Sequence, residues 1–262
     1  MVSAQFEEFE PERLVKSSQR VRDLAEVFTP ANIVDEMLDL LPDQTWTVHP
    51  SKTFLEPAVG NGNFVSAVLS RKLTLVDVAF KGQSLAAGRD RAAAEFHALQ
   101  ALSSIYGVDI SEDNIIGGTP GHEVACRPRL LGILKRWHNH LFGEELSLDA
   151  DFLKSAQWIV DHNMIIGNML DKDGNGKPTG REEMPLFEYF WVPEDRSLQV
   201  SRTTFGDVFL AAEEEQGDVL SLFGAAVPVK IWEGAYAQLF TAERNARVSL
   251  NGALTSNSKG KK

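Results

Sequence analysis

Two acids and a pair of glycines have types and positions that could bind a charged nucleoside. Glu56 follows a short apolar run and opens a turn with Gly60 and Gly62, where a backbone without side chains lets a ligand approach closely. A carboxylate in such a turn repels a pyrophosphate but attracts a positive amino group. Asp109 ends the next apolar run and could accept hydrogen bonds from two ribose hydroxyls. Together these residues predict a site for a nucleoside with a cationic amino-acid arm, which is the chemistry of S-adenosylmethionine.

The elements that must position these residues are short apolar runs that alternate with helical patterns. Strands are predicted at residues 53–55, 104–110 and 164–170. Helices are predicted twice within residues 8–41, at 64–73, at 84–103 and, with an interruption at 117–121, from 111 to 163. This alternation predicts an α/β fold with a parallel sheet covered on both faces, and such sheets bind ligands beyond the carboxyl ends of their strands.

The ends of this region carry further signals. Thr29 is a suitable N-cap for a helix that starts at Pro30. Residues 187–192 and 198–203 read as two more strands joined by a turn. The pattern weakens after them, although residues 211–215 read as helical.

Three segments in order resemble the S-adenosylmethionine motifs of N6-adenine DNA methyltransferases. They are Phe28-Thr29-Pro30, the stretch from Phe54 to Phe64, and the stretch from Tyr106 to Ile110. The resemblance is to the N-6 DNA methylase branch of restriction–modification systems and phages, and it covers residues 26–170. It implies a Rossmann-like, S-adenosylmethionine-dependent methyltransferase fold with a helical N-terminal segment and helical insertions.

The resemblance also implies a cofactor site. In that site Glu56 would hold the amino group and Asp109 the ribose. The implied cofactor-binding residues are Phe28, Thr29, Pro30, Glu56, Pro57, Ala58, Gly60, Gly62, Asn63, Phe64, Asp109, Ile110 and Asn168. We expect residues 1–26 to form a helical segment, 27–210 the methyltransferase domain and 211–262 an extension with a disordered basic tail.

The residues that transfer the methyl group in this family are altered or missing here. The family uses Asp/Asn-Pro-Pro-Tyr/Phe, in which the amide or carboxylate and a proline carbonyl accept hydrogen bonds from a flipped adenine. This chain has no two adjacent prolines. Asn168 is either the remnant of that acceptor, and thus the candidate catalytic residue, or a contact to the cofactor's adenine in the preceding motif. In the second case the catalytic tetrapeptide is absent.

Three aromatic residues at alternate positions allow two interpretations. Phe187, Tyr189 and Trp191 could stack on a flipped base. Their period of two is more typical of one face of a strand, and we favour that interpretation.

Composition limits the partners. The 262 residues include 26 Lys and Arg against 37 Asp and Glu, so the formal net charge is −11. Nucleic acid repels such a chain unless basic residues gather on one face. The best candidate for such a face is Arg127, Arg129, Lys135 and Arg136, but a run of charges is more often a solvated helix face, which we favour.

The sequence favours a cytoplasmic protein without a membrane segment. Cys126 is the only cysteine, which excludes a disulfide framework or a thiolate zinc cluster and suits a reducing compartment. No apolar run reaches the ~18 residues of a membrane helix. The first residues are acidic and polar, unlike a secretory signal.

One segment matches a metal-binding pattern in the wrong surroundings. The stretch from Asp171 to Glu182 fits the calcium-loop pattern at every specified position. Calcium loops lie between helices, whereas the flanks here read as strands and Pro178 lies within the loop. We therefore predict a polar turn that holds no metal.

Two functional hypotheses follow. The first is an S-adenosylmethionine-dependent methyltransferase that acts on the adenine amino group of DNA, directly or through a partner subunit. The second is a cofactor-binding regulatory or anti-restriction protein that no longer methylates and acts through a protein partner. The cofactor motifs favour the first, and the missing Pro-Pro and the acidic charge favour the second.

Overall fold

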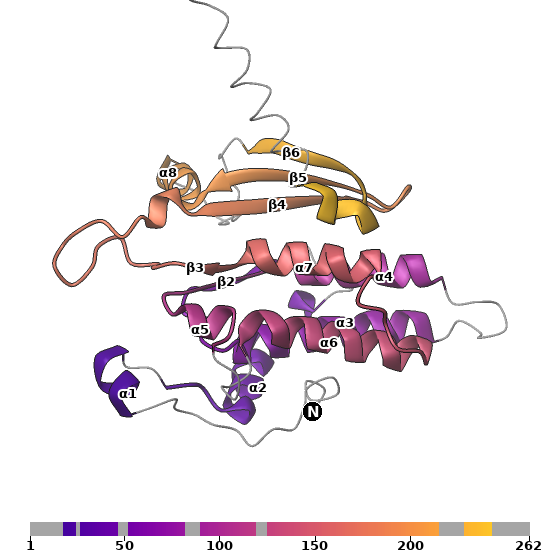
Figure 1. The fold of residues 1–262 in the computed structure, drawn as a ribbon, viewed down its shortest axis with the longest axis horizontal. Helices are drawn as coiled ribbons and strands as arrows, with labels where there is room; N and C mark the ends of the chain where they lie inside the picture. The colour runs from indigo at the N-terminus through magenta and orange to yellow at the C-terminus, as the bar shows by residue number, and fades with distance from the viewer. Residues whose placement is uncertain are drawn as a thin grey trace, which may run out of the picture.

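The computed structural model describes residues 18–24, 27–46, 52–81, 90–118, 125–214 and 228–242. They form a mixed α/β structure, in which an antiparallel sheet and the helices α3 and α6 lie on opposite sides of a parallel sheet and its neighbouring helices (Figure 1). The predicted helical residues 8–17 and 84–89 and the predicted basic tail lie outside the described residues. Among the described helices, none has both the length and the apolar content needed to cross a membrane.

The three strands predicted in the first two thirds of the chain form one parallel sheet. They are β1 (Phe54–Glu56), β2 (Ile105–Asp109) and β3 (Met164–Ile166), in the order β1-β2-β3. β3 is shorter than predicted. The Gly167 amide still donates to the Asp109 carbonyl at 2.9 Å, and the chain then leaves the sheet. The parallel α/β prediction is confirmed for these strands.

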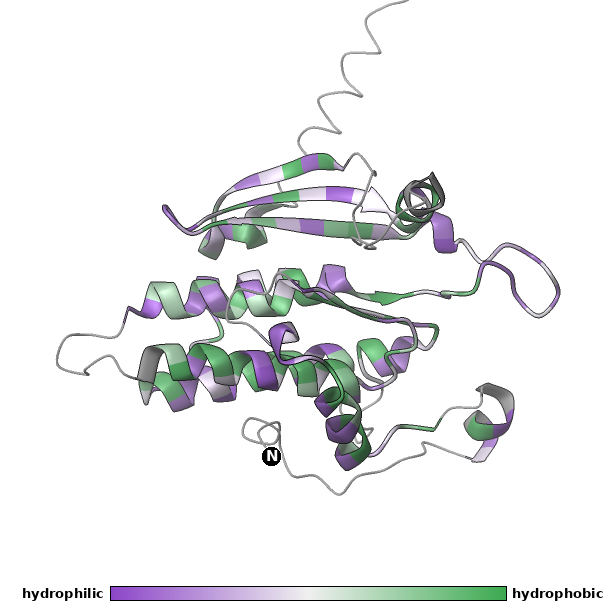
Figure 2. Cartoon of the chain, turned by 180° about the vertical axis from the view of Figure 1, so that it is seen from behind, coloured by the Kyte–Doolittle hydropathy of each residue, from purple (hydrophilic) through white to green (hydrophobic). Residues whose placement is uncertain are grey.

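Helices connect the parallel strands and bury most of the core. They are α3 (Asn63–Lys81), α4 (Arg91–Ser103), α5 (Glu112–Ile115), α6 (Cys126–Phe142) and α7 (Asp151–Asn163). α3 continues past its predicted end because Val76 is fully buried and extends the apolar side of the helix. Trp137 of α6 and Phe96 of α4 are the largest apolar side chains that are almost completely buried in this core. Figure 2 shows that the long loop after β3 is, by contrast, mainly hydrophilic.

The helix predicted after Thr29 is α2 (Ala31–Asp39), but the predicted cap is wrong. Pro30 occupies the N-cap position, and its carbonyl accepts a hydrogen bond from Val34 at 3.0 Å. Arg71 of α3 pairs with two acids of α2, at 3.0 and 2.7 Å. α2 is therefore fixed to α3, and the segment just before it is held near the start of α3.

The later strands form a separate antiparallel sheet rather than an extension of the parallel one. It contains β4 (Pro185–Val192), β5 (Ser197–Thr204) and β6 (Val229–Ala235), in that order. The two predicted strands are confirmed as the hairpin β4–β5. β6 was not predicted. It belongs to the predicted extension, residues 211–262, yet it pairs with β5 of the predicted methyltransferase domain, so the sheet crosses that boundary. The helix predicted at 211–215 starts earlier, as α8 (Phe205–Glu214). Short 3-10 turns are η2 (Asp43–Thr45), η4 (Arg181–Glu183) and η5 (Tyr236–Thr241).

The aromatic residues of β4 attach the antiparallel sheet to the ends of helices α7 and α4. The Tyr189 hydroxyl donates to Asn163 Oδ1 at 2.8 Å, and Trp191 Nε1 donates to Ser103 Oγ at 3.0 Å. Phe187 is buried in the same interface. These residues line one face of a strand, as favoured above, and the alternative that they stack on a flipped base is wrong.

Two residues of the predicted basic cluster on α6, Arg127 and Arg129, bond to neighbouring elements and do not form a solvated or open positive face. Arg127 donates to the Met164 carbonyl and pairs with Asp161 at 3.0 Å. Arg129 donates to a side chain of α3, and His138 is completely buried. The prediction of a solvated face is therefore wrong for Arg127 and Arg129, because their guanidinium groups bond to other parts of the chain.

Lys72 of α3 is a buried amine beneath the start of the parallel sheet. Its Nζ donates to Ser104 Oγ at 2.6 Å and to the Lys52 carbonyl at 3.1 Å, and its side chain is 1% exposed. Burial lowers the pKa of Lys72 to about 7. As the pH falls below the unfolded pKa of about 10.4, the unfolded chain binds a proton that the folded chain does not, so the folded state loses relative stability until about pH 7.

We expect Lys72→Met to remove this pH dependence. Between pH 10 and pH 7, the wild-type free energy of unfolding should fall relative to that of the variant by an amount on the order of 4 kcal/mol. Urea denaturation of both proteins at pH 7, 8.5 and 10 measures this difference. A constant difference across the three values would mean that Lys72 keeps its proton in the folded chain.

Candidate functional site

Glu56 and Asp109 end neighbouring parallel strands, so the structure brings the two predicted acids to one edge of the sheet. Glu56 of β1 lies opposite Gly107 of β2. The pairing continues past β1, because the Val59 amide donates to the Val108 carbonyl at 2.9 Å. The glycine turn therefore runs directly beside Asp109. This edge is where an open α/β sheet binds its ligands.

The Asp109 carboxylate links the ends of both strands. Its Oδ2 accepts from the Gly60 amide at 2.8 Å. Its Oδ1 accepts from the Ser111 amide at 2.8 Å and from Asn114 Nδ2 at 3.1 Å. A carboxylate offers about four lone-pair positions. One ribose hydroxyl can therefore join at Oδ2, while a second must share Oδ1 or displace one of these donors.

Two glycines in the turn are required by backbone angle and by close packing. Gly60 has φ +56°, and a Cβ there would lie 3.1 Å from the Phe28 ring. Gly62 has φ +93°, and a Cβ there would lie 3.0 Å from the sulfur of Cys126. Residues that carry a side chain rarely adopt such positive φ angles. The turn is thus packed between the segment before α2 and the first turn of α6.

Glu56 is a half-buried acid whose surroundings favour a cationic ligand. Burial raises the pKa of Glu56, and its hydrogen bond from the Ala58 amide, at 3.3 Å, partly lowers the pKa again. A nearby cation would stabilise the carboxylate further. Pro57 and Ala58 are exposed beside it. An amino group of a ligand fits this position.

The segment from Phe28 to Pro30 lies against the glycine turn, as the resemblance implies. Phe28 is buried with its ring against Gly60. The Thr29 carbonyl accepts from Asn63 Nδ2 at 2.7 Å. These residues therefore join the two acids at one site. Phe64 is the exception, because its half-buried ring packs against the core rather than at this edge.

Ile110 and Asn168 are the two remaining predicted residues at this edge. Ile110 directly follows Asp109 at the end of β2, and it is 60% exposed. Asn168 follows the last residue that pairs with β2, and its Oδ1 accepts from the Leu170 amide at 3.0 Å. The structure therefore places Asn168 beside β2 and separates it from Glu56 by the width of β2.

Three residues that hold this site were not recognised from the sequence. Ser111 and Asn114 orient Asp109, and Arg129 contacts Asn63. Ser111 begins α5, and a serine followed by acids is a helix-start signal that places these donors near Asp109. Arg129 belongs to the cluster considered for DNA, and only tertiary contacts reveal its role.

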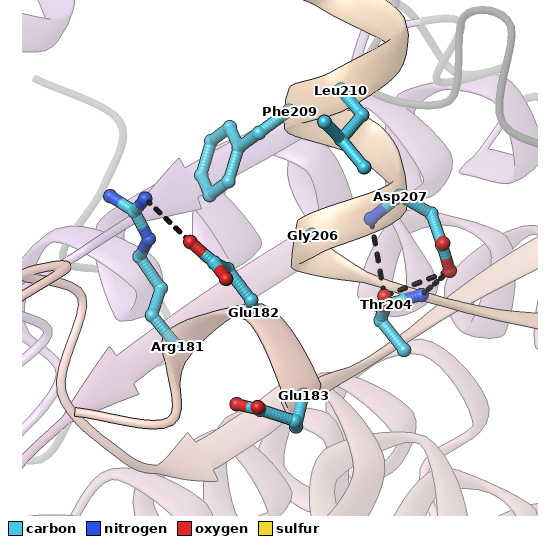
Figure 3. Close-up of a pocket in the computed structure, with 8 residues that line it drawn as sticks. All are labelled: Arg181, Glu182, Glu183, Thr204, Gly206, Asp207, Phe209 and Leu210. Atoms are coloured by element: carbon cyan, nitrogen blue, oxygen red, sulfur yellow. Dashed lines mark hydrogen bonds and ion pairs between the residues drawn. The ribbon is translucent and has the colours of Figure 1, made fainter. Parts of the chain in front are cut away.

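A pocket elsewhere in the described residues contains none of the predicted site residues. It has a volume of about 460 Å³ between η4, the end of β5 and α8 (Figure 3). Arg181 lies over the Phe209 ring at 4.6 Å and near Glu182 at 3.8 Å. The Thr204 hydroxyl accepts from the Asp207 amide at 3.2 Å, and Asp207 Oδ2 accepts from the Thr204 amide at 3.1 Å, so the two residues cap the start of α8 reciprocally. Arg181 pairs with Glu182 and Thr204 bonds to Asp207, and these contacts do not identify a class of ligand for the pocket.

The calcium-like loop uses an acid to close its own turn. Asp173 Oδ1 accepts from the amides of Asn175 at 2.8 Å and Lys177 at 2.9 Å, and these bonds lower the pKa of Asp173. A 3-10 turn and a strand follow the loop, where a calcium loop would have a helix. Among the described residues, no three His, Cys, Asp or Glu side chains are grouped to hold a metal.

We expect millimolar Ca²⁺ to leave the thermal midpoint of the protein unchanged. A ligand that binds only the folded state must raise that midpoint. Asp173 Oδ1 accepts two hydrogen bonds from the loop backbone, and a strand rather than a helix follows the loop, which is not the geometry of a calcium loop. A Ca²⁺-dependent rise that disappears in Asp173→Ala would overturn this prediction.

Comparisons with known proteins give no relative for this chain. No family model, curated protein or solved structure matches it. The geometry of the site is therefore the basis for the function proposed below.

Proposed function

We propose that the carboxyl edge of β1 and β2 binds S-adenosylmethionine. The observation that carries this proposal is the position of Glu56 and Asp109 at adjacent strand ends, with the Gly60 turn between them. Glu56 would take the amino group of the methionine arm. Asp109 would take a ribose hydroxyl, and the bare turn would let the ligand approach the backbone.

The direction of the ligand supports one of the two roles considered for Asn168. With the arm at β1 and the ribose at β2, the adenine would point toward β3, and the exposed Ile110 at the end of β2 offers it an apolar contact. Neighbouring strands are about 4.8 Å apart, so Asn168 is roughly 10 Å from the arm end. The methyl group lies between the arm and the ribose. Asn168 is therefore suited to contact adenine rather than to accept the target amine.

The wider proposal is that the chain is related to adenine-N6 DNA methyltransferases and supplies their cofactor-binding half. In the proposed transfer, the lone pair of the adenine amine attacks the methyl carbon and the carbon–sulfur bond breaks. The bond electrons pass to sulfur, which becomes a neutral thioether, and the amine loses a proton. The groups that accept hydrogen bonds and the proton from the target amine would come from residues outside the described ranges or from a partner subunit.

The second candidate is a regulatory protein that binds the cofactor without methylating and acts through a protein partner. Its specific support is that Arg127 and Arg129, the basic residues considered for DNA, bond to neighbouring elements instead. The net charge of −11 also favours protein partners over nucleic acid.

Calorimetry with S-adenosylhomocysteine and S-adenosylmethionine tests the binding proposal, and a tritiated-methyl transfer assay on DNA separates the two candidates. We expect saturable binding of both ligands. No heat at millimolar ligand would refute the cofactor site. Binding without methyl transfer would support the regulatory candidate. Methyl transfer that requires an added partner protein would support the proposal that this chain is the cofactor-binding subunit of a methyltransferase.

We expect Asn168→Ala to weaken S-adenosylhomocysteine binding about 5- to 10-fold, the effect of losing one hydrogen bond. The Asn168 amide nitrogen can donate to a ring nitrogen of adenine, since its oxygen accepts from Leu170. Asn175→Ala, in the same loop, is the matched control and should bind normally. Unchanged affinity in Asn168→Ala would return Asn168 to the role of catalytic remnant.

A further inference from the structure

Asn63 lies where three parts of the site meet. Its Nδ2 donates to the Thr29 carbonyl at 2.7 Å, and its Oδ1 accepts from Arg129 Nη1 of α6. The next residue toward β1, Gly62, packs against Cys126 at the start of α6. One amide side chain thus connects the segment before α2, the glycine turn and α6.

The partners of Asn63 permit only one orientation of its amide. The Thr29 carbonyl can only accept, and the Arg129 guanidinium can only donate. A carboxylate at this position would keep the bond to Arg129 but repel the Thr29 carbonyl. An apolar side chain would lose both bonds. Residue 63 must therefore present a donor and an acceptor at once, which an amide does.

We propose that Asn63, oriented by Arg129, is the positioning residue that holds residues 28–30 over the glycine turn. The Asn63 bond fixes Thr29, and Phe28 next to it covers Gly60. This inference rests on the proposed function for its effect on ligands. Because the covered turn follows Glu56, the segment shapes the end of the site that takes the amino-acid arm. Loss of Asn63 or Arg129 should therefore weaken ligands with that arm more than adenosine, which lacks it.

Hydrogen exchange of the ligand-free protein tests the positioning step. We compare wild type with Asn63→Asp and Arg129→Met, and read the amides of residues 27–29. Both variants should exchange faster there because the segment opens locally more often. Arg127→Met is the matched control on the same helix, since Arg127 bonds to Asp161 and Met164 and not to Asn63. The control should leave this exchange unchanged, and faster exchange in all three variants would indicate a merely structural role and overturn the proposal.

Ligand affinity tests the consequence. Asn63→Asp and Arg129→Met should bind S-adenosylhomocysteine about 10-fold more weakly, while adenosine affinity changes little. Arg129→Lys should restore part of the loss, because it keeps a donor for Asn63. Equal losses for both ligands, or none, would overturn the proposal even if Asn63→Asp fails to fold, since Arg129→Met gives an independent result. If wild type binds neither ligand, the proposed function fails, and the exchange data alone decide whether Asn63 holds the segment.

Discussion

Replacement of Asp109 by alanine should weaken S-adenosylmethionine binding by about 1–3 kcal/mol, or about 5- to 150-fold in affinity. The carboxylate has two tasks in the proposed complex. It accepts a ribose hydroxyl, and it holds the Gly60 amide at 2.8 Å, which fixes the turn beside it. Alanine removes the first and loosens the second. It also leaves the Ser111 amide and Asn114 without their acceptor.

Isothermal calorimetry of wild type and variant measures this loss, and a thermal melt of each reports its stability. Glu112→Gln is the matched control, because it removes one acidic charge from an exposed position of α5 without touching the turn. It should bind like wild type. Asp109→Ala with wild-type affinity and a normal melt would exclude Asp109 from the site. A lower melting temperature with unchanged affinity at a temperature where the protein is folded would assign Asp109 a purely structural role.

The parts of the site that the sequence predicts are those whose chemistry is local. Glu56 and Asp109 end apolar runs, and parallel strands carry such residues to one edge whatever the rest of the fold does. Gly60 and Gly62 lie between a strand and a helix, where positive φ is common, and both have it. Alternating apolar residues likewise suffice to predict the hairpin that contains Tyr189.

The parts that the sequence does not reveal depend on contacts between distant residues. Arg129 and Asn63 are 66 positions apart, so neither residue predicts the other. β6 pairs with β5, although the sequence between these two strands carries no pattern that predicts their pairing. The few apolar residues of β6 do not by themselves identify it as a strand. Thr29 fits the pattern of a cap, but its carbonyl bonds to Asn63 and Pro30 takes the cap position. Tertiary structure overrides local preference at each of these points.

The isolated chain should transfer no methyl group to unmodified duplex DNA above the background of the assay. Positioned reactants account for as much as about 7–11 kcal/mol of catalysis, and misplacement by about 1 Å can cost on the order of 100-fold in rate. Here the family's acceptor motif has no intact counterpart, because no two prolines are adjacent in the chain. Asn168 lies across β2 from Glu56, and Met169 and Leu170 follow it in place of two prolines.

The assay uses tritiated S-adenosylmethionine at saturating concentration, with duplex and single-stranded DNA, because an unpaired base needs no flipping energy. Single-stranded DNA that is methylated while duplex is not would show that the acceptor site exists and that base flipping is the missing step. If neither DNA substrate is methylated although the cofactor binds, the groups that accept hydrogen bonds from the target amine would belong to another chain. Robust transfer to duplex DNA by the isolated chain would contradict the prediction, and Asn168→Ala would then show whether that amide is the acceptor, because its loss should abolish transfer while cofactor binding persists.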